Sequence, residues 1–302
     1  MATYNGEQFL RQQIDSILNQ GYKDFEFIIC DDKSNDSSID IVSSYMVKHP
    51  QIKLYKNSIR LGSLKNFEKA ITLSCGEYIA LCDQDDIWRE DKLKIQLSLL
   101  QSINNSNRTP IMVHSDLRMI NDKNSIIKKS YFKFRKYKLK ESKDLSHILG
   151  PCGVMGNTIV MNKALKKLVL PFPDTLTTHH DYWIAIINEI YGQRVTCLEP
   201  LVDYRIHEKN LSNSINNINK NLLKIRKLPY FNLGREKLIY TILKRDNISK
   251  ADRDILKKYL KYFDKNSSRI VKYYILIKYD FVKRDWYYRL NLLISLLFTK
   301  KV

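Results

Sequence analysis

The 302-residue chain is 44% apolar and 11% aromatic, and it carries a formal net charge of +19. This composition indicates a folded protein and argues against a disordered one, and the length allows one large domain or a domain with an appendage. Five cysteines without a Cys-x-x-Cys pair favour reduced thiols over a zinc site. No charged segment followed by an apolar one opens the chain, so we expect it to stay in the cytoplasm.

The positive charge is concentrated in the last third of the sequence. Residues 209–302 carry 23 Lys or Arg against 7 Asp or Glu, whereas residues 1–208 are nearly neutral. A neutral body with a basic tail indicates two surfaces, one for chemistry with carboxylates and one attracted to a polyanion such as a membrane leaflet or nucleic acid. The alternative is a lysine-rich bias on solvated helices.

The first half of the chain alternates helix and strand patterns. Helical periods cover residues 6–19, 34–49, 63–74 and 91–103, and short apolar runs predict strands at 25–30, 52–55, 78–82 and 110–115. Strands that alternate with helices in this way predict an α/β fold with a mostly parallel sheet flanked by helices.

The second half is less regular. Residues 128–143 are basic and aromatic without a period, which predicts either a surface excursion near an anionic ligand or membrane, or a poorly ordered loop. A strand over 154–161 with Gly156 and Asn157 inside it, a helix over 182–191 and a strand over 195–198 follow. From about residue 213, segments rich in Lys, Tyr, Leu and Ile predict a basic helical extension.

The last helical segment, residues 286–298, contains an apolar run that is too short to span a bilayer, which takes about 20 residues. Trp and Tyr beside an apolar face with flanking Lys favour a helix that lies in the headgroup zone. A helix docked on the protein body would show much the same pattern.

A run of carboxylates follows the strand predicted at 78–82. Asp83, Asp85 and Asp86 lie within four positions. Like charges this close repel one another and raise one another's pKa unless a cation neutralises them. Since open α/β sheets bind ligands at the carboxyl ends of their strands, the run predicts a divalent metal site. The alternative is that Asp83 and Asp85 are loop carboxylates and that Asp86 caps the next helix.

Four ordered segments identify a family resemblance. They are Ala2-Thr3-Tyr4-Asn5-Gly6, Asp31-Asp32-Lys33-Ser34, Asp83-Gln84-Asp85-Asp86 and His180-Asp181-Tyr182-Trp183. With them, residues 1–215 resemble the family 2 inverting glycosyltransferases of the GT-A (Rossmann-like) fold, within them the rhamnosyltransferase-type enzymes of bacterial surface polysaccharide synthesis. Tyr204-Arg205-Ile206-His207 with Asn210 looks like a further family element. We therefore expect a catalytic domain over residues 1–212 and a basic helical region over 213–302.

The resemblance implies that Mg²⁺ or Mn²⁺ neutralises the departing diphosphate. It makes Asp85 the direct metal ligand and aims Asp83 at the ribose or the metal, while Asp86 supports them or caps a helix. His207 would complete the coordination, unless it is a surface histidine beside Glu208.

The resemblance also implies a UDP- or dTDP-sugar donor. Asp31 or Asp32 would accept a hydrogen bond from the pyrimidine ring N–H, and Thr3, Tyr4 and Asn5 would assist. Arg60 would reach a phosphate. The alternatives are that the two aspartates and Ser34 form a turn and that Arg60 is simply exposed.

Inversion by direct displacement needs one general base across the anomeric carbon from the diphosphate. The resemblance assigns this role to Asp181, with His180 orienting its carboxylate. A helix that starts beside Asp181 favours the ionised form, although the residue would serve equally as an N-cap. Trp183 packs against a sugar face or fills the core.

The enzyme so implied moves rhamnose or another hexose onto a lipid-linked glycan at the inner face of the cytoplasmic membrane, and binds no nucleic acid. One alternative is a sugar nucleotidyltransferase, which would need a Gly-rich loop with Arg and Lys that Gly6-Glu7-Gln8 does not supply. The other is a nucleic-acid-binding protein that uses the basic tail.

Family members usually carry a short apolar strand directly before the segment that matches residues 2–6. Almost none of this strand precedes Thr3 here. Either the start has been set too far downstream or the sheet lacks this strand. Because the strand would pair within the sheet and aim Thr3 to Asn5 at the base, we expect its absence to lower folding stability and nucleotide affinity.

Overall fold

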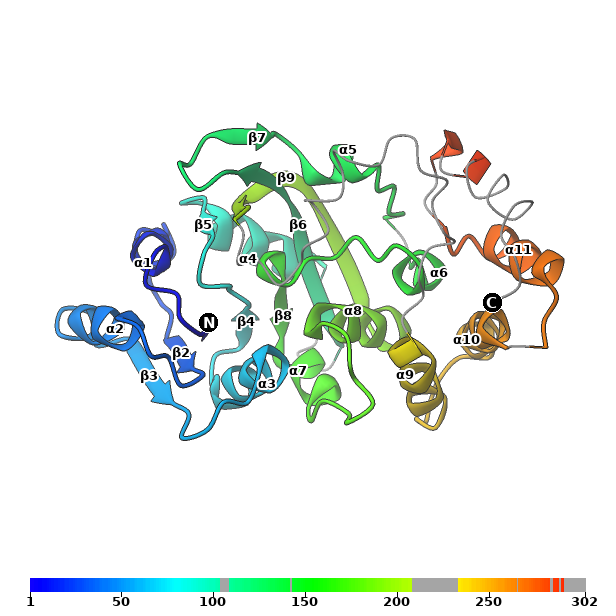
Figure 1. Ribbon diagram of the computed structural model, residues 1–302, viewed down its shortest axis with the longest axis horizontal. Coiled ribbons are helices and arrows are strands. Elements are labelled where there is room, and N and C mark those ends of the chain that lie inside the picture. Colours follow the sequence, from blue (N-terminus) through cyan, green and yellow to red (C-terminus); the bar gives the residue numbers. More distant parts are fainter. Residues whose placement is uncertain are drawn as a thin grey trace.

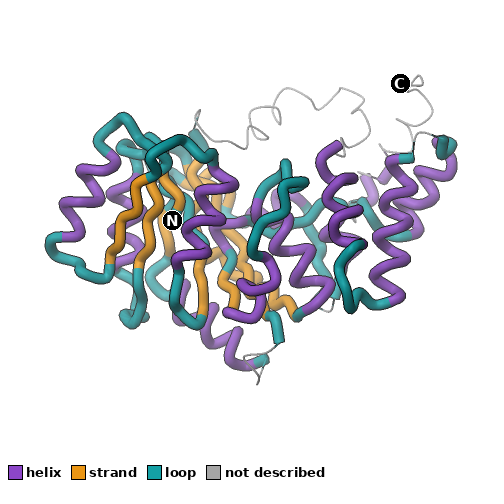
Figure 2. The backbone as a smooth tube through the Cα atoms, turned by 90° about the horizontal axis from the view of Figure 1, so that it is seen from below, coloured by secondary structure: helices purple, strands orange, loops and turns teal. Residues whose placement is uncertain are grey.

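A computed structural model describes residues 1–103, 109–141, 143–207, 233–264, 266–282, 285–287 and 289–290. Figure 1 shows three parts from left to right, namely a small sheet with its helices, a larger sheet, and a group of C-terminal helices. In the view from below the strands are enclosed by helices (Figure 2), as expected for an α/β protein.

The small sheet is parallel and has the order β1-β2-β3. Its strands are β1 (Ala2–Thr3), β2 (Phe27–Asp31) and β3 (Ile52–Lys56), and Ala2 pairs with Cys30. The helices of this part are α1 (Leu10–Leu18), α2 (Ser38–Met46) and α3 (Ser63–Leu73). Every residue of β2 is buried, because α1 and α2 lie on one side of the sheet's core and α3 packs against β2.

The larger sheet has six strands in the order β4-β8-β6-β9-β5, with β7 paired to β6. These are β4 (Tyr78–Ala80), β5 (Ile87–Trp88), β6 (Ile111–Ile120), β7 (Ile126–Lys128), β8 (Val160–Asn162) and β9 (Gln193–Arg205). The α/β class is confirmed, but the strand directions are more mixed than the sequence predicts. Only β6 and β9 run parallel here among the described strands, and the other pairs are antiparallel.

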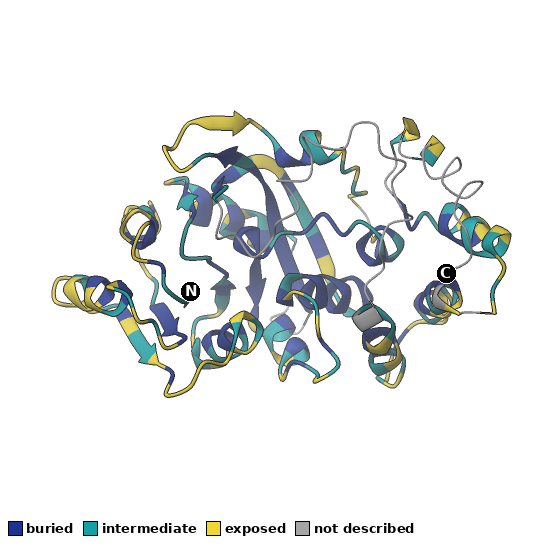
Figure 3. Ribbon diagram, viewed as in Figure 1, coloured by how far each residue is buried: buried dark blue, intermediate teal, exposed yellow. Residues whose placement is uncertain are grey.

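Three helices pack against this sheet, namely α4 (Lys92–Ser102), α7 (Lys163–Val169) and α8 (His180–Tyr191). Ten of the twelve residues of α8 are buried, so this helix lies inside the core. Figure 3 shows β6, β8 and α8 as the buried centre of the molecule and β7 as an exposed edge.

The basic segment 128–143 is more ordered than predicted. It contains helix α5 (Tyr131–Arg135), in which Tyr131 and Phe132 are buried. Asp116 of β6 holds the start of this helix, because its carboxylate accepts hydrogen bonds from the backbone N–H groups of Tyr131 and Phe132, both at 3.0 Å. The N-terminal end of the segment 128–143 therefore packs on the larger sheet.

The strand predicted over 154–161 is wrong in its first half. Gly156–Thr158 forms the 3₁₀ turn η1, and strand β8 begins only at Val160. The side chain of Asn157 is buried and bonds to another loop, so this segment cannot follow the pleat of a strand.

The C-terminal helices pack on the body. Helices α6 (Leu145–Leu149), α9 (Leu233–Leu243), α10 (Lys250–Phe263) and α11 (Arg269–Lys278) share one hydrophobic core with α8. The hydroxyl of Tyr259 on α10 donates to the carbonyl of Leu149 at 2.7 Å. The predicted boundary at 212/213 and most of the segment 286–298 lie outside the described residues. Within the described part, no helix is both long and apolar enough to cross a membrane.

Candidate active site

The acidic run lies in the loop between β4 and β5. Asp86 is fully buried, and its carboxylate accepts hydrogen bonds from the Asn157 side-chain amide at 2.5 Å and from the Arg205 backbone N–H at 3.1 Å. Burial, followed by the nearby Asp85 and Asp83 charges, raises the pKa of Asp86 well above its usual range. The alternative of a helix cap is wrong for Asp86, since α4 begins at Lys92 with Asp91 before it.

Asp85 meets His207, as the predicted metal site requires. The Asp85 Oδ2 and His207 Nε2 atoms are 2.9 Å apart, and both side chains are mostly buried. The ring of Phe9 lies 5.0 Å from the imidazole, so His207 is held between an aromatic ring and a carboxylate. Among the described residues no cluster of three His, Cys, Asp or Glu side chains forms a ready-made metal site.

Asp83 connects this pair to the predicted base. Burial, together with the charges of Asp85 and Asp181, raises the pKa of Asp83 to about 7. Both of these acids are therefore near Asp83. The structure therefore brings together three acids that are separated by about 100 positions in the sequence.

Asp181 lies in the first turn of α8 and is not its N-cap, which is His179. Its Oδ1 accepts from the Tyr182 backbone N–H at 2.6 Å, and its Oδ2 accepts from the Gly156 backbone N–H at 3.2 Å. The two backbone N–H donors fix the orientation of this carboxylate at the start of the helix.

His180 packs against η1. Its ring stacks on Phe67 at 3.9 Å between centroids, and burial lowers the pKa of the imidazole to about 4, so it is neutral at pH 7. A Cβ atom on Gly156 would lie 2.7 Å from His180 Nε2, so only glycine allows the two to approach this closely. Trp183 is buried and donates to the carbonyl of Val169, which identifies it as a core residue.

Gln84 ties the acidic loop to the N-terminal segment. Its Oε1 accepts from the Thr3 hydroxyl at 2.7 Å and from the Tyr4 backbone N–H at 2.8 Å, and its Nε2 donates to the Tyr4 carbonyl at 3.1 Å. The amide thus pairs with Tyr4 as a neighbouring strand would. The loop that carries Asp83 and Asp85 is joined in this way to the small sheet.

The predicted donor-binding residues also lie together. Both carboxylate oxygens of Asp31 accept from Ser34, whose hydroxyl in turn accepts from the Asn5 backbone N–H at 2.9 Å. Asp31 therefore forms a turn with Ser34, and its contact with a nucleotide base stays a prediction. The guanidinium of Arg60 lies 4.0 Å above the ring of Tyr4.

Asp32 holds the loop before α3. Its Oδ1 accepts from the backbone N–H of Leu61 at 2.7 Å and its Oδ2 from that of Gly62 at 2.8 Å. The Asn57 side chain donates to the same carboxylate at 3.0 Å. Because the loop that it holds carries Arg60, Asp32 fixes the place of that side chain.

Three residues of the site had no role assigned from the sequence, namely Gln84, Asn157 and Arg205. Arg205 is fully buried and donates to the Asp85 carbonyl at 2.9 Å, to the Gln12 side chain at 2.7 Å and to the Asn124 side chain at 2.5 Å. The sequence feature that could have identified Asn157 is the Gly-Asn pair inside an apolar run. For Arg205 it is the position two residues before His207.

Comparison with known proteins agrees with this geometry. Residues 1–168 match the family described as Glycosyl transferase family 2. An uncharacterized glycosyltransferase, MJ1057 of Methanocaldococcus jannaschii, is 34% identical over 228 residues, which cover 74% of each chain. The Escherichia coli protein WfgD, named as a UDP-Glc:alpha-D-GlcNAc-diphosphoundecaprenol beta-1,3-glucosyltransferase, is 27% identical over 71% of this chain and 78% of its own.

Among solved structures, Staphylococcus aureus TarS 1-349 in complex with UDP-GlcNAc matches with a TM-score of 0.60 and 16% identity over 97% of this chain and 77% of TarS 1-349. At that identity the likeness describes the fold, which is the expected GT-A fold with a C-terminal helical region. The matching residues include the acidic loop and strands β1 to β8. The chain belongs to glycosyltransferase family 2.

Proposed function

We propose that the chain is a metal-dependent, inverting hexosyltransferase that transfers a sugar from a UDP or dTDP donor to a lipid-linked glycan. The observation that carries the proposal is the turn η1, in which Gly156 N–H donates to Asp181 and the Asn157 amide donates to Asp86 of the acidic loop. In this arrangement Asp85 would hold the cation and the diphosphate, and Asp181 would act as the base.

The residues present fit a divalent cation. Asp83 and Asp85 supply carboxylate oxygens, and His207 supplies an imidazole nitrogen 2.9 Å from Asp85. Oxygen ligands with one imidazole suit Mn²⁺ and also Mg²⁺. When bound, the cation would withdraw negative charge from the departing diphosphate. It would also supply positive charge beside Asp83, whose pKa is raised by burial and then by the Asp85 and Asp181 charges.

The proton would move to Asp181. The acceptor hydroxyl attacks the anomeric carbon while the bond to the diphosphate breaks, and its proton passes to the Asp181 carboxylate. The N–H groups of Tyr182 and Gly156 keep that carboxylate oriented. His180 would act as a positioning residue, because its ring packs against the same turn and is neutral.

The donor would lie over the small sheet. Tyr4 with Arg60 above it offers an aromatic face for the pyrimidine and a cation for a phosphate. WfgD, a UDP-glucose enzyme by name, favours UDP-glucose as the first donor to test, and dTDP-rhamnose is the second. The same relative acts on a diphosphoundecaprenol-linked sugar, which favours a lipid-linked acceptor.

A surface for the membrane would run along β7, α5 and residues 285–287. Ile126, Ile127 and Trp286 are 50%, 45% and 73% exposed. Lys136 contacts Asp285 at 2.9 Å, which joins α5 to the C-terminal segment. Exposed apolar side chains beside Lys suit the headgroup zone of an anionic leaflet, and would keep the enzyme at the inner face of the cytoplasmic membrane.

Asp181→Asn tests the base. The amide cannot accept a proton, so we expect turnover to fall by about 10² to 10⁴-fold while donor affinity stays nearly unchanged. Release of nucleoside diphosphate with a lipid-linked acceptor measures turnover, and calorimetry measures donor binding. Asp174→Asn, at a fully exposed carboxylate, is the control. Normal turnover of Asp181→Asn would rule out its role as base.

Asp85→Asn tests the metal site. With Mn²⁺ at about 100 times its dissociation constant, the wild type should gain about 2.7 kcal/mol of stability, and the variant should lose most of that gain. Thermal unfolding with and without Mn²⁺ and UDP-glucose or dTDP-rhamnose measures the effect. Asp174→Asn again serves as control. An equal gain in wild type and Asp85→Asn would contradict metal binding at this loop.

The acid cluster predicts a pH dependence of stability. Folding raises the pKa of Asp83 from 3.8 to about 7, so the folded protein holds this proton more tightly than the unfolded chain. The stabilisation is complete below about pH 4 and is lost as the pH rises through about 7. Metal-free Asp83→Asn should therefore be more stable than wild type at pH 8, by at least about 1 kcal/mol. Urea unfolding at pH 8 and pH 5 measures this, and a difference independent of pH would contradict it.

The membrane surface predicts preference for anionic lipid. Sedimentation with vesicles of phosphatidylglycerol should recover several times more protein than sedimentation with phosphatidylcholine, and added salt should reduce the difference. Ile126→Ser combined with Trp286→Ser should weaken binding without changing nucleotide affinity. Equal recovery with both lipids would exclude this surface.

A further inference from the structure

Helix α5 carries a cation that is flanked by aromatic rings. The guanidinium carbon of Arg135 lies 5.8 Å from the centre of the Tyr131 ring and 5.9 Å from that of the Tyr137 ring. The two rings are 6.0 Å apart and inclined by 57°. Arg135 is half-buried, so the rings flank the cation while part of it stays exposed to solvent. We call Tyr131, Arg135 and Tyr137 the α5 cluster.

The fold fixes the position of the α5 cluster. The Asp116 carboxylate on β6 accepts from the backbone N–H of Tyr131 and thereby anchors the start of α5. The backbone of Lys136 is left-handed, with a φ of 55°, and it turns the chain so that the Tyr137 N–H donates to the Phe132 carbonyl at 2.9 Å. Tyr137 is in this way held beside Tyr131 by main-chain hydrogen bonds.

The inner side of the α5 cluster adjoins the turn that holds the candidate base. Met155 packs against the hydrophobic core that contains Tyr131, and it directly precedes Gly156. The Gly156 N–H donates to the Asp181 carboxylate. Burial raises the pKa of Tyr131, and the charges of Arg135 and Asp181 act on it in opposite directions. The cation of the cluster and the candidate base therefore both lie near Tyr131.

The outer side of α5 belongs to the membrane surface proposed above. Lys136 Nζ lies 2.9 Å from the Asp285 carboxylate and 6.0 Å from the centre of the Tyr287 ring. Lys128 Nζ, at the end of β7, lies 5.6 Å from the centre of the Phe134 ring. In the view of Figure 1, α5 lies between β7 and the red C-terminal segment. The helix thus connects the candidate base with the surface that would contact lipid.

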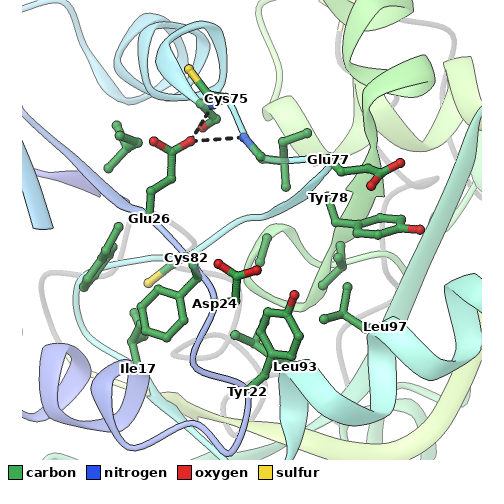
Figure 4. Close-up of a pocket in the computed structure, with 18 of the residues that line it drawn as sticks. Ile17, Tyr22, Asp24, Glu26, Cys75, Glu77, Tyr78, Cys82, Leu93 and Leu97 are labelled. Carbon is green, nitrogen blue, oxygen red and sulfur yellow. Dashed lines mark hydrogen bonds between the residues drawn. The ribbon is translucent and has the colours of Figure 1, made fainter. Parts of the chain in front are cut away.

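A cavity of about 640 Å³ between β2 and β4 is a separate feature, and none of the three residues of the α5 cluster lines it. Figure 4 shows the carboxylates of Asp24, Glu26 and Glu77 around this cavity. Since carboxylates repel an anion, a phosphate group would favour the α5 cluster over the cavity.

In a lipid-linked acceptor the diphosphate lies between the sugar and the lipid. The sugar hydroxyl must reach Asp181 while the lipid stays in the membrane, so the diphosphate has to pass beside α5. A guanidinium presents parallel N–H donors that match two oxygens of a phosphate. Rings that restrict the rotation of the guanidinium reduce the entropy that is lost when the phosphate binds.

We propose that the α5 cluster binds the diphosphate of the lipid-linked acceptor, with Arg135 donating N–H groups to the phosphate oxygens. This inference rests on the proposed function, in which Asp181 is the base and the acceptor is lipid-linked. Arg135 then selects the acceptor, while the donor and the cation belong to the small sheet and the acidic loop.

The binding experiment uses geranyl diphosphate, which has a lipid chain and a diphosphate but no sugar. Calorimetry with saturating UDP and Mn²⁺, which occupy the donor side, measures its affinity. We expect Arg135→Gln to weaken binding of geranyl diphosphate at least about 10-fold and to leave UDP affinity unchanged. Arg135→Lys, which keeps the charge but not the parallel donors, should recover part of the loss. Lys133→Gln removes an exposed charge from the same helix and should bind as the wild type does.

Thermal unfolding checks that each variant is folded, and Arg135→Lys takes the place of Arg135→Gln if the latter is not. Equal affinity of the wild type and a folded Arg135 variant for geranyl diphosphate would overturn the proposal. Geraniol that binds as tightly as geranyl diphosphate would overturn it too, because geraniol lacks the diphosphate. Inorganic diphosphate that binds as tightly would mean a site for free anions, and would exclude a lipid-linked ligand.

A transfer assay separates this site from the proposed function. Its two acceptors are N-acetylglucosamine diphosphate on a short alkyl chain, after the acceptor in the name of WfgD, and octyl N-acetylglucosaminide, which has no diphosphate. Arg135→Gln should raise the KM of the first acceptor at least about 10-fold and leave kcat and the second acceptor nearly unchanged. An equal effect on both acceptors would contradict a diphosphate site. If the wild type transfers sugar to neither, the proposed function fails, and the affinity for geranyl diphosphate still decides the role of Arg135.

Discussion

Several carboxylates of like charge lie together in the site, and the groups around them compensate for their repulsion. Burial, and then the charges of Asp85 and other nearby acids, raises the pKa of Asp83 and Asp86. Backbone N–H groups, one amide side chain and the start of α8 offset part of this cost. The repulsion that remains suits a site that binds a cation, since a bound cation would supply the positive charge that offsets it.

Antiparallel pairing explains how these acids meet. Ala80 at the end of β4 pairs with Val160 at the start of β8, so η1, which precedes β8, lies beside the acidic loop that follows β4. Ile87 of β5 pairs with Asp203 of β9 in the same sense, which puts Arg205 and His207 next to Asp85. In η1, Gly156 holds Asp181 and Asn157 holds Asp86, so one turn fixes both acids.

Local sequence patterns predicted much of the candidate site. An apolar run that ends in acids, and an acid at a helix start, are visible in sequence, and both lie in the site because burial and helix ends have local signals. The roles of Gln84, Asn157 and Arg205 were not predictable, since each depends on a partner at least 70 positions away. The mixed strand directions were missed for the same reason, because β8 is a short strand inserted between two others.

The site is divided between the two sheets, and Gln84 spans the division. The proposed nucleotide-binding residues Tyr4, Asn5 and Arg60 belong to the small sheet, and the acids belong to loops and helices of the larger one. Gln84 lies in the acidic loop, yet its amide pairs with Tyr4 in the manner of a strand. The proposed donor-binding residues and the acids are therefore coupled through the Gln84 amide, so a shift of the acidic loop would also move Tyr4.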